Sequence, residues 1–73
     1  MKRIREARSH LREATDLLRQ ALALENAAKK GEISEKAAAM PATRLLAQAI
    51  SESDAAKRKM RAFVHDMEKS LHP

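Results

Sequence analysis

The first half of the chain carries apolar residues at helical spacing. They recur at alternating steps of three and four residues, as in Ile4, Ala7, Leu11, Ala14, Leu18 and Ala21. This spacing places them on one face of an α-helix, and Leu17, Leu22 and Leu24 widen that face. Because alanine alternates with larger residues, a second helix can approach closely. The pattern predicts a long helix over residues 2–30.

Stop and start signals follow this helix. Two lysines precede Gly31, where cations favour a helix C-terminus and glycine can adopt the left-handed conformation that closes it. Ser34 is suited to cap a short helix. Pro41 is expected to interrupt that helix, because the residue before a proline is disfavoured in the helical conformation. Residues 31–43 are therefore predicted to form an elbow that contains a short helix.

Helical periodicity returns after the elbow. Thr43 can cap a second helix, whose apolar positions include Leu46, Ala49, Ile50, Ala56, Met60, Phe63, Val64, Met67 and Leu71. This pattern predicts a long helix over residues 43–71. At 1.5 Å per residue both long helices would measure roughly 43 Å, and equal lengths suit an antiparallel hairpin.

The composition favours helices but limits the core. The 73 residues include one glycine, two prolines and a single aromatic residue. A chain this short buries a small core, so the free energy of folding of a lone monomer comes out near zero. We predict one all-α domain over residues 1–73, a helical hairpin with a short helical elbow that dimerises into an antiparallel four-helix bundle with coiled-coil-like packing.

The core and the dimer interface are predicted to share one set of large apolar residues. Its members are Leu11, Leu17, Leu18, Leu22, Leu24, Leu46, Ile50, Met60, Phe63 and Met67. Leu17 and Leu24 lie on a second side of the broad apolar face of the first helix. We expect these two residues to be buried against the partner copy.

The formal net charge of +5 is concentrated toward the two ends of the chain. In a helical first segment, four arginines fall within about 60° of one another beside the apolar face, with no acid interrupting them; we call Arg5, Arg8, Arg12 and Arg19 the arginine strip. The second helix adds Arg58, Arg61 and Lys69, which antiparallel packing would bring to the same end of the molecule. The strip is interpreted either as a solvated flank that pairs with acids or as an anion-binding surface.

The segment EKAAAMPATRLLAQAI, residues 35–50, resembles a helix-turn-helix in its spacing. Pro41 would lie in the turn, where glycine is usual, and Thr43 would open the second helix. The resemblance implies DNA binding, with Arg44 and Gln48 contacting bases. The alternative interpretation is a structural elbow between two packed helices.

Nothing in the sequence has the pattern of a catalytic or metal site. Cysteine is absent, which removes disulfides and thiolate ligands and suits a reducing cytoplasm. Ser9 and His10 are adjacent, and neighbours on a helix do not face each other. No apolar run approaches the roughly 18 residues of a membrane span. We expect a cytoplasmic protein with no catalytic residues, no metal, no cofactor and no membrane insertion.

Two functional hypotheses follow. The first is a non-catalytic, basic protein-interaction module, such as an adaptor, inhibitor or assembly subunit, whose partners are a second copy of the chain and another protein. The second is a nucleic-acid accessory or regulatory protein that contacts phosphates through the arginine strip. Single-strand binding usually needs exposed aromatic residues, which are missing here, so the second hypothesis concerns duplex backbone. The first is preferred because acids are interspersed with the bases along both helices.

Overall fold

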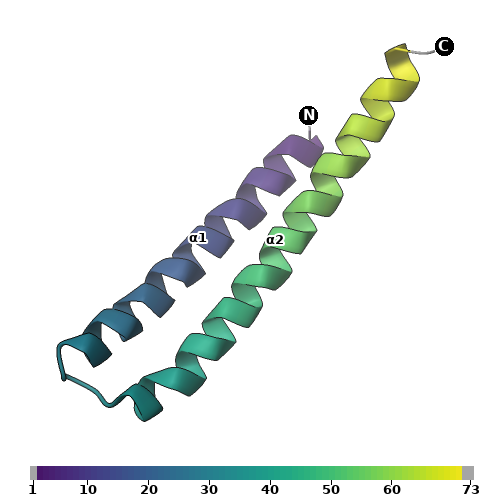
Figure 1. The fold of residues 1–73 in the computed structure, drawn as a ribbon. Helices are drawn as coiled ribbons and strands as arrows, with labels where there is room; N and C mark the ends of the chain where they lie inside the picture. The colour runs from purple at the N-terminus through teal and green to yellow at the C-terminus, as the bar shows by residue number, and fades with distance from the viewer. Residues whose placement is uncertain (1, 72–73) are drawn as a thin grey trace.

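The protein is a hairpin of two antiparallel helices. The computed structural model describes residues 2–71, in which α1 spans Lys2–Lys29 and α2 spans Glu35–Leu71. The two helices lie side by side, and α2 continues beyond the N-terminal end of α1 (Figure 1). The predicted all-α hairpin is confirmed.

The hairpin is a thin rod. It measures 60 × 15 × 14 Å, and its radius of gyration is 17.2 Å. A compact globular chain of this length would have a radius of gyration of about 11 Å. Each helix therefore has only one neighbour, and most of its circumference faces outward.

The end of α1 is closed by Gly31, as predicted. Gly31 has a φ of +77°, a left-handed conformation that side chains with a Cβ rarely adopt. The N–H of Glu32 donates to the carbonyl of Ala27 at 2.9 Å, and the N–H of Gly31 donates to the carbonyl of Ala28 at 3.1 Å. These two bonds form a Schellman motif, which satisfies carbonyls that the helix end would leave without a partner.

Ser34 caps the second helix, also as predicted. The N–H of Ala37 donates to the Ser34 side-chain oxygen at 3.0 Å, and the N–H of Ala38 donates to the Ser34 carbonyl at 3.0 Å. The helix that begins here is long, however, and the connection between the two helices is only residues 30–34.

The predicted elbow over residues 31–43 is wrong, because α2 runs without a break through Pro41. The helices are also unequal, with 28 residues in α1 and 37 in α2. A proline inside a helix removes one hydrogen bond and costs about 3 kcal/mol. Burial of Ala38, in the turn before the proline, accompanies this cost and helps to offset it. Local propensity alone predicted a break that helix packing overrides.

The helix-turn-helix interpretation of residues 35–50 is wrong for the same reason. These residues form one continuous stretch of α2, without the turn that such a motif requires. Thr43 opens no helix either. Its hydroxyl donates to the Ala39 carbonyl at 2.7 Å, inside the helix.

Pro41→Ala is expected to raise the free energy of unfolding by about 2 kcal/mol, because alanine supplies the missing N–H and removes the clash of the ring with the preceding turn. Urea unfolding measures this gain. Helical content by circular dichroism should stay unchanged, since α2 already passes through this position. A loss of stability would instead show that the restriction proline places on the unfolded chain outweighs its cost in the helix.

The contact between the helices is made almost entirely of alanine. The buried residues of the hairpin are Ala7, Ala14, Leu17, Ala21, Ala38, Ala49 and Ala56. Three of these alanines on α1 and two on α2 repeat every seven residues, which keeps them facing the other helix. We call Ala7, Ala14, Ala21, Ala49 and Ala56 the alanine seam. Because alanine is small, the seam allows close helix approach but buries little apolar surface.

The expectation that Leu17 is buried only against a partner copy is wrong. It is already buried inside the hairpin, and Leu24 is half-buried. With the alanine seam packed against α2, α1 is oriented so that the side of its broad face that carries Leu17 and Leu24 also meets α2. The leucines on the other side of the seam are left exposed instead.

Candidate functional site

One flank of the helix pair carries polar contacts between the two helices, including ion pairs. The Nζ of Lys59 lies 2.6 Å from Oε2 of Glu6, and Nδ1 of His10 lies 2.5 Å from Oε2 of Glu52. Hydrogen bonding from Lys59 holds the pKa of Glu6 below its ordinary value. These contacts link residues that face each other across the antiparallel helices. We call this side of the hairpin the ion-pair flank.

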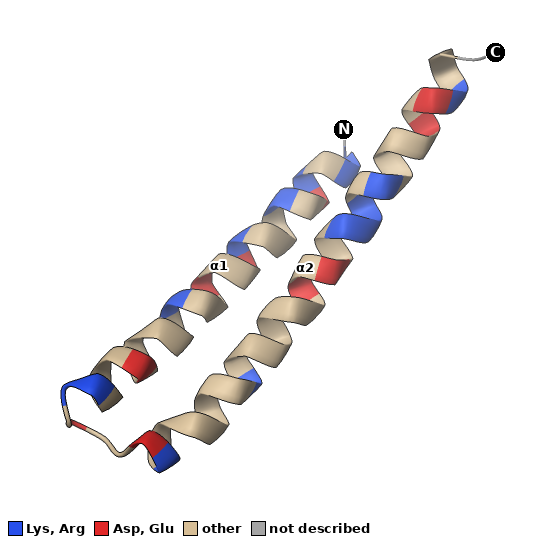
Figure 2. Ribbon diagram, viewed as in Figure 1, with Lys and Arg blue, Asp and Glu red and all other residues tan. Residues whose placement is uncertain are grey.

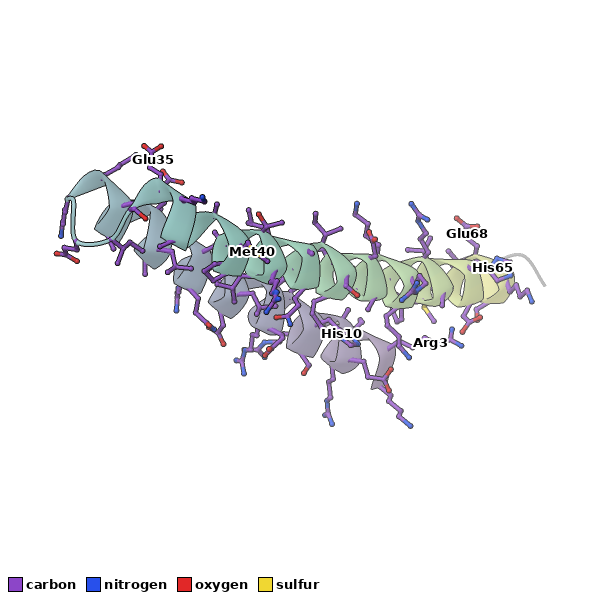
Figure 3. All side chains as sticks on the ribbon, turned by 90° about the horizontal axis from the view of Figure 1, so that it is seen from below. Arg3, His10, Glu35, Met40, His65 and Glu68 are labelled. Atoms are coloured by element: carbon purple, nitrogen blue, oxygen red, sulfur yellow. The ribbon has the colours of Figure 1, made fainter. Side chains whose placement is uncertain are left out.

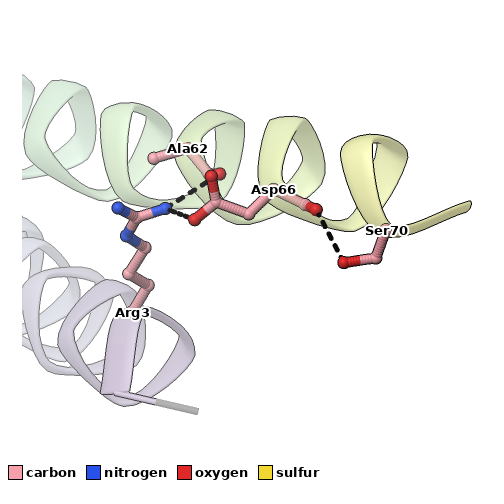
Figure 4. Close-up of polar contacts among 4 residues, drawn as sticks. All are labelled: Arg3, Ala62, Asp66 and Ser70. Carbon is pink, nitrogen blue, oxygen red and sulfur yellow. Dashed lines mark hydrogen bonds and ion pairs between the residues drawn. The ribbon is translucent and has the colours of Figure 1, made fainter. Parts of the chain in front are cut away.

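A third contact extends the ion-pair flank to the N-terminal end of α1 (Figure 4). Nη1 of Arg3 pairs with the carboxylate of Asp66 and also donates to the carbonyl of Ala62 at 3.0 Å. The Ser70 hydroxyl donates to the Asp66 carbonyl at 3.2 Å, one turn further along α2. Sequence reasoning missed this role for Arg3, because no local pattern links residues so far apart in the chain.

The opposite flank is apolar. At about 100° per residue, Ile4, Leu11 and Leu18 lie across the alanine seam from Glu6 and His10. Large apolar residues of both helices continue this side, and each is between 42% and 63% exposed. We call Ile4, Leu11, Leu18, Leu22, Leu46, Ile50, Met60, Val64 and Met67 the apolar flank.

Two shallow hollows show that the apolar flank crosses from one helix to the other. One hollow of about 350 Å³ is lined by Leu18 together with Leu46 and Ile50. Another of about 250 Å³ is lined by Leu18, Leu22 and Leu46. Leucines of α1 and apolar residues of α2 therefore share one open surface.

The predicted interface residues divide into two groups. Leu17 is buried, and Leu24 and Phe63 are half-buried. The remaining seven residues are exposed and lie on the apolar flank. They are Leu11, Leu18, Leu22, Leu46, Ile50, Met60 and Met67. The helical spacing in the sequence placed the seam alanines on the apolar faces of the two helices, but the predicted list of core and interface residues left them out.

The arginine strip lies on the side of α1 that is turned away from α2. Arg5, Arg8 and Arg12 are exposed and form no ion pair with another described residue. Arg19 lies 3.9 Å from Asp16. The expectation that no acid interrupts the strip is wrong, because Asp16 is three residues before Arg19 and four after Arg12. Arg8, Arg12, Asp16 and Arg19 line one open hollow of about 390 Å³.

The basic residues of the second helix do not join this strip. Lysines and arginines gather along the N-terminal half of α1 and the neighbouring stretch of α2 (Figure 2). By helical geometry, however, Arg58 and Arg61 are turned away from α1. Lys69 lies in the last turns of α2, near His65 and Glu68, which extend beyond α1 (Figure 3). The seven predicted anion contacts therefore do not form one surface.

Arg44 and Gln48 lie on the outer surface of α2. They line an open hollow of about 500 Å³ with Met40, Pro41 and Leu45. This position gives them no recognition geometry of the kind that a helix-turn-helix provides.

Between Lys2 and Leu71, no three His, Asp or Glu residues are grouped so that they could hold a metal ion. Neither α1 nor α2 is long and apolar enough to cross a membrane. No protein family model, no curated protein and no solved structure matches this chain.

Proposed function

We propose that this protein is a non-catalytic interaction module that self-associates through the apolar flank. The observation that supports this proposal is the solvent exposure of the large apolar side chains. Within residues 2–71, Leu17 is the only large one that is buried, and nine others line one flank. Exposed apolar surface of this extent marks an interaction site in soluble proteins. A chain without cysteine also suits the reducing cytoplasm, where we place it.

The energetics support association. Removing the remaining exposure of a half-buried leucine or isoleucine contributes about 1 kcal/mol. Two copies that each cover their flank therefore gain on the order of 15 kcal/mol, against an association cost of about 4–15 kcal/mol. The lone hairpin has an alanine seam and little else to offset its ordering entropy, so association stabilises the fold itself.

The occupant that we propose for the apolar flank is a second hairpin. The flank runs along both helices from Ile4 to Leu22 and from Leu46 to Met67. Two such flanks packed face to face form a four-helix bundle, with the large apolar residues inside and the ion-pair flanks outside. An adaptor or inhibitor role would then use the remaining outer faces of this dimer.

Sedimentation equilibrium tests this proposal on the unmodified chain. We expect a species of twice the 8.2 kDa chain mass at about 100 μM, and dissociation with loss of helicity on dilution. A cooperative, fully helical species of 8.2 kDa at every concentration would overturn it. That result would leave the apolar flank of the monomer open to another protein.

A further inference from the structure

Three acids near the N-terminal half of α1 are engaged in contacts between the helices on the ion-pair flank. Glu6 pairs with Lys59, Glu52 with His10 and Asp66 with Arg3. On the outer side of α1, Asp16 is the acid that contacts the arginine strip, and it reaches only Arg19. The strip therefore keeps most of its charge available to an external anion.

The strip is straight and rigid because one helix presents all of it. Its four arginines are separated by three, four and seven residues, so they extend over about 21 Å of helix axis. Each strand of a nucleic-acid duplex carries one phosphate per roughly 3.4 Å of axis. A row of guanidinium groups on one helix therefore matches the backbone of about six base pairs.

Self-association leaves the strip accessible. Helical geometry places the strip further around α1 than the apolar flank, on the side away from the alanine seam. A second hairpin on the apolar flank would border Arg8 but would not cover Arg5 or Arg12. The proposed dimer therefore carries two strips on its outer surface.

We propose that the arginine strip binds the phosphate backbone of duplex nucleic acid without reading its sequence. Single strands are a poorer fit because the one aromatic residue, Phe63, is half-buried and lies on the other helix. The strip holds no asparagine or glutamine that could read bases. Arginine forms paired hydrogen bonds to phosphate oxygens, which gives affinity with little sequence preference.

Fluorescence anisotropy with the full chain and labelled duplexes of mixed sequence, about 20 base pairs long, tests this. Duplex DNA and duplex RNA form separate arms, and each supports the proposal if bound. With four phosphate contacts, affinity should fall roughly a hundredfold between about 50 and 200 mM salt. For the double variant Arg8→Gln with Arg12→Gln, the loss of affinity over the same salt range should be only about tenfold, because two phosphate contacts are removed.

A charge-matched variant distinguishes the contribution of the arginine strip to binding from that of the net charge of the protein. Lys30→Gln with Lys36→Gln removes two charges near the connection between the helices, where both lysines are exposed. This variant should keep the steep salt dependence, while both variants keep the helicity and the mass of the unmodified protein. No duplex binding at low salt would overturn the proposal, as would an equal loss in the two double variants. Binding of polyglutamate that duplex cannot displace would assign the strip to an acidic protein instead.

Discussion

Leu18→Asp is expected to leave a monomer where the unmodified protein forms a dimer. Leu18 is 50% exposed in the hairpin and lines both hollows of the apolar flank. In the lone hairpin a carboxylate at this position stays hydrated and costs little. Between two hairpins it would be an unpaired buried charge, which costs several kcal/mol. The dimer dissociation constant, measured by sedimentation equilibrium, should rise by at least about a hundredfold.

Met40→Asp is the matched control for this change. Met40 is 67% exposed, on the outer surface of α2 beside Pro41 and away from the apolar flank. The substitution Met40→Asp introduces the same charge in place of a large apolar residue, and it should leave the dimer intact. Equal effects of the two substitutions would contradict an interface on the apolar flank.

Ala56→Leu is expected to destabilise the hairpin by about 3 kcal/mol, the upper part of the usual range for overpacking. Ala56 is 0% exposed and lies in the alanine seam. A leucine there has no space beside the backbone of α1, so the helices must separate or the side chain must adopt a strained rotamer. Thermal unfolding followed by circular dichroism should show a lower midpoint.

Ala47→Leu provides the comparison on the same helix. Ala47 is exposed, and helical geometry turns it away from α1. Alanine and leucine have similar helix propensities, so this change should alter stability by less than about 0.5 kcal/mol. If both leucine variants unfold at the same temperature, the seam does not require small residues.

The alanine seam also explains why the apolar flank is exposed. Small residues at the line of closest approach bring the two backbones together, and the larger residues then lie beside that line. On one side of the seam, ion pairs such as Glu6 with Lys59 cover the edge of the contact. On the other side, Leu18 and Leu46 meet at an open hollow. The asymmetry between the flanks gives the hairpin a single apolar side.

Several features follow from short stretches of sequence and were predictable from them. The helical spacing from Ile4 to Ala21 predicts α1, and the position of Gly31 predicts its end. Ser34 predicts the start of α2 because a hydroxyl can accept the N–H of the third helical residue. Each depends on groups only a few residues apart.

Other features depend on contacts across the hairpin. The sequence by itself determined two amphipathic helices, a glycine-closed turn between them and an excess of positive charge. Only the tertiary structure decided that α2 passes through Pro41, that Leu17 is buried while Leu18 is exposed, and that Arg3 pairs with Asp66. Periodicity states which residues share a face, but the rotation of each helix is set by the packing of the other. That rotation determines which residues become the core and which are left to bind.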